Sequence, residues 1–205
     1  MWILGIFTVI ALLIFAVIRQ EMRPVISGRE GEKKIAHILR KQGLMVFNNI
    51  ILMIDGRTVQ IDHIAISNNG VFVLETKNHH GVIFGDSYKK EWYQNTPSGG
   101  RYRFYNPVWQ NYGHVKTVEK LLGLDEKLIR SVVVFASDPV LAVMASDMPV
   151  ITAGELPHWL KSNKEPVLSP LEVEYYASKI KNLNCQCRKV EKDHVKAVQN
   201  RKLAA

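Results

Sequence analysis

The spacing of hydrophobic and polar residues along the chain predicts a mixture of helices and strands. Residues 28–42 carry apolar side chains at helical spacing, with Ile35, Ile38 and Leu39 on one face, and Gly43 suits the end of that helix. Runs rich in β-branched residues and separated by turn residues predict strands. These strands cover residues 45–54, 58–67, 71–77, 131–136 and 150–152, and one or two shorter strands are expected between residues 81 and 105.

The second half of the chain carries the signals of further helices. Asn106 suits an N-cap and Pro107 suits the first helical position, so we expect a helix from there to about Leu122. Residues 155–161 and 171–183 also have helical patterns. The order of helix, three strands, helix, strand and helices predicts an α/β (α+β) fold, in which helices flank a mixed β-sheet.

The N-terminal segment differs from the rest of the chain because Trp2 to Ile18 contains no charged residue. A helix of this length spans about 25 Å, which is at the short end for a hydrocarbon core of ~30 Å. The segment lacks the basic start and the cleavage site of a signal peptide, and it has no polar stripe of the kind that a soluble core helix carries. We therefore predict that residues 1–23 form a transmembrane anchor and its flank.

The positions of the charged residues and the cysteine content indicate where in the cell the chain is located. Basic residues lie after the apolar run, at Arg19, Arg23, Lys33 and Lys34. The positive-inside rule then predicts a single-pass protein of the cell membrane with its C-terminal domain in the cytoplasm. Two closely spaced cysteines, Cys185 and Cys187, do not make a disulfide framework.

The remaining chain divides into a globular domain over residues 24–184 and a basic tail over residues 185–205. The net charge of +8 favours nucleic acid or anionic lipid as a partner but does not choose between them.

The candidate chemistry lies on two predicted strands that are joined by an Asn-Asn-Gly turn. Side chains alternate along a strand, so Glu75 and Lys77 share one face. A two-residue loop that begins at Asn69 makes Asp62 face Lys77, whereas a loop that begins at Asn68 makes Asp62 face Glu75. Both registers bring the two carboxylates and the ammonium group to the same face of the sheet.

Such a cluster suits a divalent cation. Two close carboxylates repel each other, and Mg²⁺ prefers oxygen ligands that are completed by water and phosphate. We therefore expect Asp62 and Glu75 to bind Mg²⁺ or Mn²⁺, which would polarise a phosphodiester and activate a water molecule. Lys77 would orient that water or offset developing charge. The plainer alternative is a solvated strand face with ordinary charged residues.

Five blocks around these residues occur in a fixed order. They are Gly28-Arg-Glu-Gly-Glu32, Gln60-Ile-Asp-His-Ile64, Glu75-Thr-Lys-Asn78 followed by Gly81, Trp92, and Asn106-Pro-Val-Trp-Gln110. Over about residues 27–135 the chain thus resembles the nuclease-related domain (NERD) family. The resemblance implies a restriction-endonuclease-like core of the PD-(D/E)xK type, although Gln60-Ile stands in place of the proline that names this motif.

The resemblance also implies roles for individual residues. Asp62 and Glu75 would be metal ligands and Lys77 the catalytic lysine. Glu32, on the first helix, would approach the metal or its waters. Gln110, in the first turn of the later helix, would face the site.

Two other groups of residues have open interpretations. An aromatic and basic segment holds Lys89, Lys90, Arg101 and Arg103, which would contact nucleic acid if the neighbouring aromatic rings stack on bases. Those rings are equally suited to a hydrophobic core. Among the histidines, His63 is expected on the face opposite Asp62, and His79 and His80 are expected to be an exposed pair in a loop. His114 shares a helix face with Gln110.

The sequence therefore predicts a membrane-anchored, Mg²⁺-dependent nuclease that hydrolyses phosphodiester bonds of DNA or RNA. Its partners would be nucleic acid, with DNA favoured, and the membrane. The alternative is a catalytically silent, membrane-tethered module that keeps the nuclease-like fold and binds nucleic acid or protein.

Overall fold

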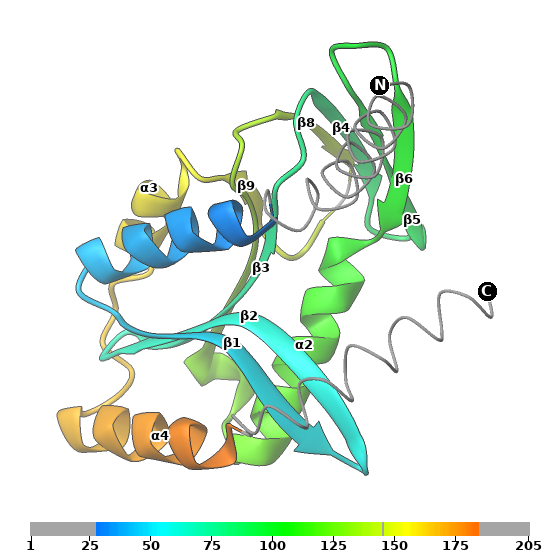
Figure 1. Ribbon diagram of the computed structural model, residues 1–205. Coiled ribbons are helices and arrows are strands. Elements are labelled where there is room, and N and C mark those ends of the chain that lie inside the picture. The colour runs from blue at the N-terminus through cyan, green and yellow to red at the C-terminus, as the bar shows by residue number, and fades with distance from the viewer. Residues whose placement is uncertain (1–27, 145, 185–205) are drawn as a thin grey trace, which may run out of the picture.

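The computed structural model describes residues 28–144 and 146–184 (Figure 1). The predicted membrane anchor and the basic C-terminal tail lie outside these residues. Across the described ranges, no helix is both long enough and apolar enough to cross a membrane.

The N-terminal helix covers residues 28–41 and ends, as predicted, before Gly43, whose φ of 84° stops the helical turn. The later helices are α2 (Pro107–Leu122), α3 (Leu156–Ser162) and α4 (Pro170–Leu183), with a short 3₁₀ turn η1 (Glu126–Leu128). The strands are β1 (Met45–Ile54), β2 (Arg57–Ser67), β3 (Gly70–Lys77), β4 (Val82–Asp86), β5 (Glu91–Asn95), β6 (Arg101–Tyr105), β7 (Ile129–Phe135), β8 (Val140–Met144) and β9 (Val150–Thr152).

The strands form a central sheet and a smaller second sheet. The central sheet has the order β1-β2-β3-β7-β9, with antiparallel pairs from β1 to β3 and parallel pairs from β3 to β9. The second sheet has the order β6-β5-β4-β8, in which β8 is parallel to β4. The predicted number of strands between residues 81 and 105, one or two, was too low, because three strands lie there. The prediction also missed β8, a five-residue strand defined by its pairing with β4.

Helices cover both faces of the central sheet, as Figure 1 shows. On one face, Val115 and Val118 of α2 and Ile180 of α4 pack on the sheet. On the other face, the N-terminal helix contributes Ile35 and Leu39 and α3 adds further apolar residues. The predicted fold class, a mixed sheet flanked by helices, is thereby confirmed for the described residues.

A buried polar contact and a close steric approach fix the helices that carry candidate site residues. The buried side chain of Asn111 donates hydrogen bonds to Val73 O at 3.1 Å and Val132 O at 3.2 Å, which holds α2 against β3 and β7. The N-terminal helix approaches the sheet at Gly31, where an added Cβ would lie 3.0 Å from Asn78 Cβ and 3.1 Å from Ala136 Cβ. A larger residue at Gly31 would therefore push Glu32 away from the sheet.

Candidate active site

The β2–β3 hairpin sets the geometry of the candidate site. The strands pair from Ser67 with Gly70 to His63 with Leu74, so the loop begins at Asn68. The next positions along this register are Asp62 and Glu75, which therefore face each other, as in the second of the two predicted arrangements. The backbone pairing of β2 with β3 ends before these two residues. Beyond it, the Thr76 amide donates a hydrogen bond of 2.9 Å to the side-chain atom Asp62 Oδ2.

Glu75 and Lys77 contact each other and α2. The Lys77 ammonium group donates hydrogen bonds to Glu75 Oε1 at 2.6 Å and to Gln110 Oε1 at 3.0 Å. Glu75 is only 1% exposed. The other oxygen, Glu75 Oε2, lies 3.5 Å from His114 Nδ1. We call Asp62, Glu75 and Lys77 the carboxylate–lysine cluster, and Gln110 lies beside it as the resemblance implies.

Burial raises the pKa of both carboxyl groups, and a neighbouring carboxylate adds to the shift of each. The pKa of Glu75 is raised to about 8, chiefly by burial and next by the charge of Asp62, against the lowering effect of Lys77. The pKa of Asp62 is raised to about 6 by burial, although the Thr76 amide and Lys77 both lower it. At neutral pH, proton uptake at Glu75 therefore relieves the repulsion between the two groups.

Glu32 reaches the cluster from the N-terminal helix. Its carboxylate accepts a hydrogen bond of 2.9 Å from Asn49 Nδ2, and Asn49 Oδ1 accepts one of 3.0 Å from Gln60 Nε2. The charge of Glu32 contributes to the raised pKa of both Asp62 and Glu75. Glu32 therefore lies near enough to the cluster for its charge to act on both carboxyl groups.

His114 is the neighbour of the cluster to which the sequence assigned no role. Burial lowers its pKa to about 4, with a smaller contribution from the Lys77 charge, so the imidazole is neutral at pH 7. Its Nδ1 atom and Glu75 Oε2 are both buried, and neither has a hydrogen-bond partner among the described residues. The signal in the sequence was its spacing of four residues from Gln110, which puts both side chains on the same flank of α2.

The donor set fits a divalent cation. Glu75 Oε2 is a buried carboxylate oxygen without a hydrogen-bond partner in the described part of the chain, and a second carboxylate, that of Asp62, lies beside it. The described residues contain no group of three or more His, Cys, Asp or Glu side chains arranged to hold a metal ion. Proteins nevertheless usually bind Mg²⁺ through one or two carboxylates, and water and substrate phosphate supply the other ligands.

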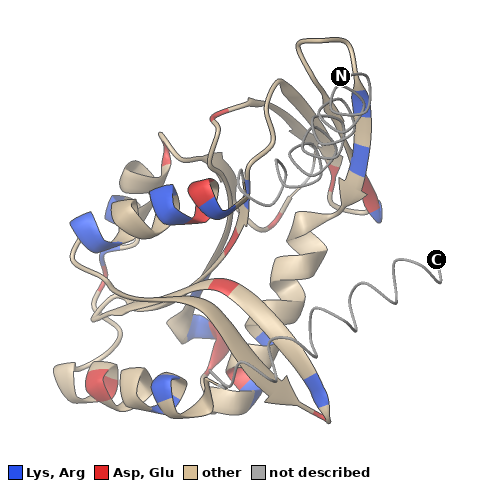
Figure 2. Cartoon of the chain, in the orientation of Figure 1, with Lys and Arg blue, Asp and Glu red and all other residues tan. Residues whose placement is uncertain are grey.

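The predicted nucleic-acid-binding residues lie apart from this cluster, on the second sheet. Lys89 and Lys90 lie in the β4–β5 turn, and Arg101 and Arg103 lie on β6 with exposed side chains. The Arg101 guanidinium group stacks over the Tyr93 ring at 4.4 Å, and Arg103 lies 3.7 Å from Glu91. Figure 2 shows basic residues along β6. Trp92 is fully buried and belongs to the core.

Two histidine predictions had different outcomes. His63 is buried on the face opposite the cluster, as expected. The prediction of an exposed pair was wrong for His79. Its Nδ1 atom is hydrogen-bonded to Gln94 Oε1 at 2.9 Å, and its ring stacks on that of Phe104 with the ring centroids 4.3 Å apart. Only His80 is exposed. The second sheet, which the sequence pattern did not reveal, provides the partners that cover His79.

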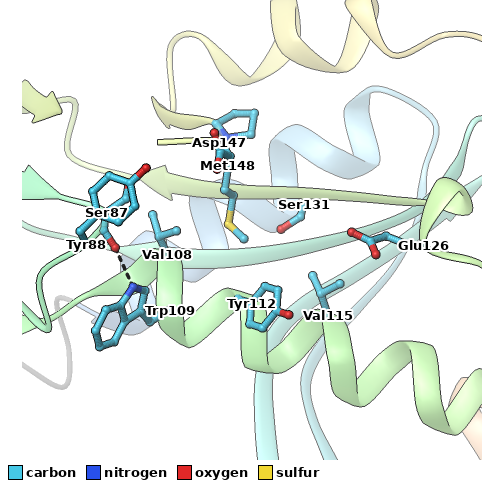
Figure 3. Close-up of a pocket in the computed structure, with 11 residues that line it drawn as sticks. Ser87, Tyr88, Val108, Trp109, Tyr112, Val115, Glu126, Ser131, Asp147 and Met148 are labelled. Carbon is cyan, nitrogen blue, oxygen red and sulfur yellow. Dashed lines mark hydrogen bonds between the residues drawn. The ribbon is translucent and has the colours of Figure 1, made fainter. Parts of the chain in front are cut away.

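A cavity of about 600 Å³ lies on the other flank of α2 (Figure 3). Its walls include Trp109 and Tyr112, and Trp109 Nε1 donates a hydrogen bond of 2.6 Å to Ser87 O. The charged residues of its lining are Glu126 and Asp147, both acidic. The cavity contains no member of the carboxylate–lysine cluster and does not suit a polyanion.

Comparison with known proteins assigns the chain to a family. The model of the nuclease-related domain matches residues 27–136, which is more than half of the chain. The chain belongs to the nuclease-related domain family. All five candidate site residues, Glu32, Asp62, Glu75, Lys77 and Gln110, lie within the matched segment of the NERD domain.

Individual similar proteins add no activity. The chain is 31% identical over 191 residues to an uncharacterised protein of Bacillus anthracis, pXO1-01, and the match covers 87% of this chain and 86% of that protein. A crystal structure of a protein of unknown function, AF1548, covers 83% of this chain and 95% of its own at 13% identity. Its TM-score of 0.36 is too low to carry an argument about the NERD fold of this chain.

Proposed function

We propose that this NERD protein is a metal-dependent nuclease that hydrolyses phosphodiester bonds of DNA or RNA. One observation carries the proposal. The carboxyl group of Glu75 is buried beside Asp62, and one of its oxygens has no hydrogen-bond partner among the described residues. A buried polar oxygen of this kind is costly unless something binds it, and a cation would relieve the repulsion between the two carboxylates once both are ionised.

Asp62 and Glu75 are the residues that would hold Mg²⁺ or Mn²⁺. When bound there, such an ion polarises a phosphodiester and lowers the pKa of a water molecule. Binding requires that Glu75 lose its proton, since its raised pKa of about 8 keeps it protonated at neutral pH. His114, which is neutral and 3.5 Å from Glu75 Oε2, can accept a hydrogen bond from a protonated Glu75.

Lys77 and Gln110 form the other half of the site. The Gln110 carbonyl oxygen accepts a hydrogen bond from the Lys77 ammonium group at 3.0 Å and so keeps the ammonium beside the carboxylates. From there the ammonium can offset negative charge that develops on a phosphate oxygen. Glu32 would bind water at the edge of the site through the carboxylate oxygen that is not bonded to Asn49.

The partners follow from charge and from the N-terminal segment. A net charge of +8 favours a polyanion, and we propose DNA as the favoured nucleic acid. Lys89, Lys90, Arg101 and Arg103 are the proposed contacts of the second sheet with phosphates. Residues 1–23 would hold the chain in the cell membrane with the NERD domain in the cytoplasm.

A cleavage assay tests the proposal. The full-length chain is incubated with labelled single-stranded and double-stranded DNA and with RNA, in Mg²⁺, Mn²⁺ or EDTA. We expect cleavage with either ion and none with EDTA or in Asp62→Asn. Stable binding without cleavage of any substrate in either ion would instead support the catalytically silent module.

A further inference from the structure

A second cavity lies between the N-terminal helix and strands β1 and β2, and three of the residues that line it are arginine or lysine. Its volume is about 530 Å³, within the range of small-molecule sites. One face of the helix contributes Arg29, Lys33, His37 and Arg40, and the strands contribute Asn48 and His63. We call this cavity the helix pocket. Basic residues of this helix are visible in Figure 2.

The three cations of the helix pocket are available to a ligand. Arg29, Lys33 and Arg40 have exposed side chains, and within residues 28–144 and 146–184 none of them forms an ion pair. Lys34 on the same helix points elsewhere and pairs with Asp138 at 2.9 Å. The acidic member of the lining, Glu32, accepts a hydrogen bond from Asn49.

The inner wall of the pocket holds a polar atom without a partner. His63 is 0% exposed, and its Nδ1 atom is hydrogen-bonded to Asn48 Oδ1 at 2.9 Å. Its Nε2 atom is buried and has no hydrogen-bond partner among the described residues. A buried nitrogen in this state indicates a place where a ligand or a bound water completes the hydrogen bonding.

The position of the helix pocket relates it to the carboxylate–lysine cluster. Glu32 lines the pocket, and its charge acts on Asp62 and Glu75. Asn49 also lines the pocket, and its side chain bridges Glu32 and Gln60, two residues before Asp62. A chain of phosphates that passes the cluster would therefore meet the three cations next.

We propose that the helix pocket binds a phosphate group of the nucleic-acid strand whose scissile bond lies at the carboxylate–lysine cluster. Arg29, Lys33 and Arg40 hold the phosphate oxygens, and His63 Nε2 contacts a polar group of the same nucleotide. This inference rests on the proposed function, because it assumes that the strand is the substrate. Arginine forks and lysine ammonium groups are the side chains that most often bind phosphate.

Binding experiments on the full-length chain in neutral detergent test the pocket. The pocket variant carries Arg29→Gln, Lys33→Gln and Arg40→Gln. The control variant carries Lys127→Gln, Lys161→Gln and Lys164→Gln, which removes the same charge from exposed positions outside the pocket. The probe is a fluorescent single-stranded DNA 20-mer, with or without a 5′-phosphate, whose anisotropy is measured in EDTA over a range of salt concentrations. Thermal melting verifies that both variants are folded.

The pocket variant should bind the 20-mer on the order of tenfold more weakly than the control variant, with the salt slope lowered by roughly 0.7 for each phosphate that the protein no longer neutralises. A weakening confined to the 5′-phosphorylated 20-mer identifies a terminal phosphate as the ligand, and an equal weakening on both probes identifies an internal phosphodiester. Equal affinity of the pocket and control variants overturns the inference. It is also overturned if the pocket variant is impaired only in binding to phosphatidylglycerol vesicles.

Failure of the proposed function has a different signature. If the unmodified chain binds the 20-mer through the pocket but never cleaves it in Mg²⁺ or Mn²⁺, the pocket stands and the nuclease assignment fails. If the chain cleaves nucleic acid and the pocket variant binds and cleaves like the control variant, the nuclease assignment stands and the pocket inference fails.

Discussion

At the scale of single residues, the buried carboxyl group of Glu75 has the largest influence on the behaviour of the candidate site. Its pKa of about 8, against an ordinary value of 4.5, means that the folded chain binds a proton there that the unfolded chain releases. The free energy of unfolding therefore falls as pH rises toward the folded pKa. His63 and His114, whose pKa values are lowered to about 4, have the opposite effect, but only below their ordinary value of 6.5.

The first prediction concerns the window from pH 6.5 to 8, where the titration of Glu75 dominates the pH dependence of the free energy of unfolding. Without metal, the free energy of unfolding should fall across this window, by at most about 1.4 kcal/mol per pH unit. Glu75→Gln should remove most of this slope, and added Mg²⁺ should restore stability at pH 8. Thermal melting of both proteins across the window provides the measurement, and a slope that Glu75→Gln leaves unchanged would show that another group is responsible.

The second prediction concerns metal binding. Asp62→Asn and Glu75→Gln should each abolish the binding of Mn²⁺, because each removes one of the two carboxylates. Asp62→Asn should also raise the melting temperature of the metal-free protein, since it removes the charge that repels Glu75. Titration calorimetry with Mn²⁺ tests both variants, and unchanged affinity in the two of them would end the metal proposal.

The third prediction concerns Lys77. Lys77→Ala leaves both carboxylates, so Mn²⁺ and nucleic acid should still bind. Removal of one charge-stabilising donor should lower the cleavage rate by about 10²–10³-fold, with little change in apparent affinity. Single-turnover cleavage and equilibrium binding on the same preparations separate the two effects. Lys116→Ala, on the exposed side of α2, is the control and should cleave normally. Full cleavage by Lys77→Ala would exclude the lysine from the mechanism.

At the scale of secondary-structure elements, the start of α2 joins the two sheets. Asn106 is fully buried and caps α2 by accepting hydrogen bonds from the amides of Val108 and Trp109. Its side-chain amide also donates to backbone carbonyls of the β4–β5 turn, at 3.2 Å to Ser87 O and 2.7 Å to Lys89 O. One side chain thereby fixes both the helix that carries Gln110 and the position of the second sheet.

The fourth prediction tests this junction. Asn106→Ala should lower the free energy of unfolding by about 2–4 kcal/mol, because it removes the cap and leaves buried carbonyl groups without donors. Asn106→Asp keeps the oxygen that caps α2 but removes the amide that donates to the turn. The difference in the free energy of unfolding between Asn106→Asp and Asn106→Ala therefore separates the contacts with the turn from the cap. Denaturant unfolding of the three proteins is the measurement. A destabilisation below about 0.5 kcal/mol in Asn106→Ala, the scale of ordinary surface changes, would show that the junction is not important.

At the scale of the whole molecule, the fold brings the paired carboxylates and two groups of cations to separate places. The carboxylate–lysine cluster lies on the α2 face of the central sheet, and the cations of the helix pocket lie on the N-terminal helix, which covers the other face. The basic residues of β6 form a third region on the second sheet.

The fifth prediction concerns the location of the whole chain. Residues 1–18 should remain in the mature protein and hold it in the membrane, with the domain on the cytoplasmic side. The full-length chain should sediment with membranes, and the domain should resist protease added to intact spheroplasts. Digestion of the domain from outside would contradict the orientation. A soluble protein that begins after residue 18 would contradict the anchor.

Local chemistry in the sequence was sufficient for much of the central fold. Runs rich in β-branched residues between turn residues predicted β1, β2 and β3, and the N-cap Asn106 with Pro107 predicted a helix to about Leu122, where α2 ends. These elements could be predicted because turns, caps and alternation act over a few residues. The alternation of side chains along β3 was also enough to place Glu75 and Lys77 on one face.

Only the tertiary structure decided the features that depend on partners distant in the chain. Two loops were compatible with the Asn-Asn-Gly turn, and the pairing of β2 with β3 selected the one that sets Asp62 opposite Glu75. Strand β8 is short and half-exposed, and it is defined by its parallel pairing with β4. The buried oxygen of Glu75, the neutral His114 beside it and the helix pocket all result from burial by other elements, which residue spacing along one strand or helix does not determine.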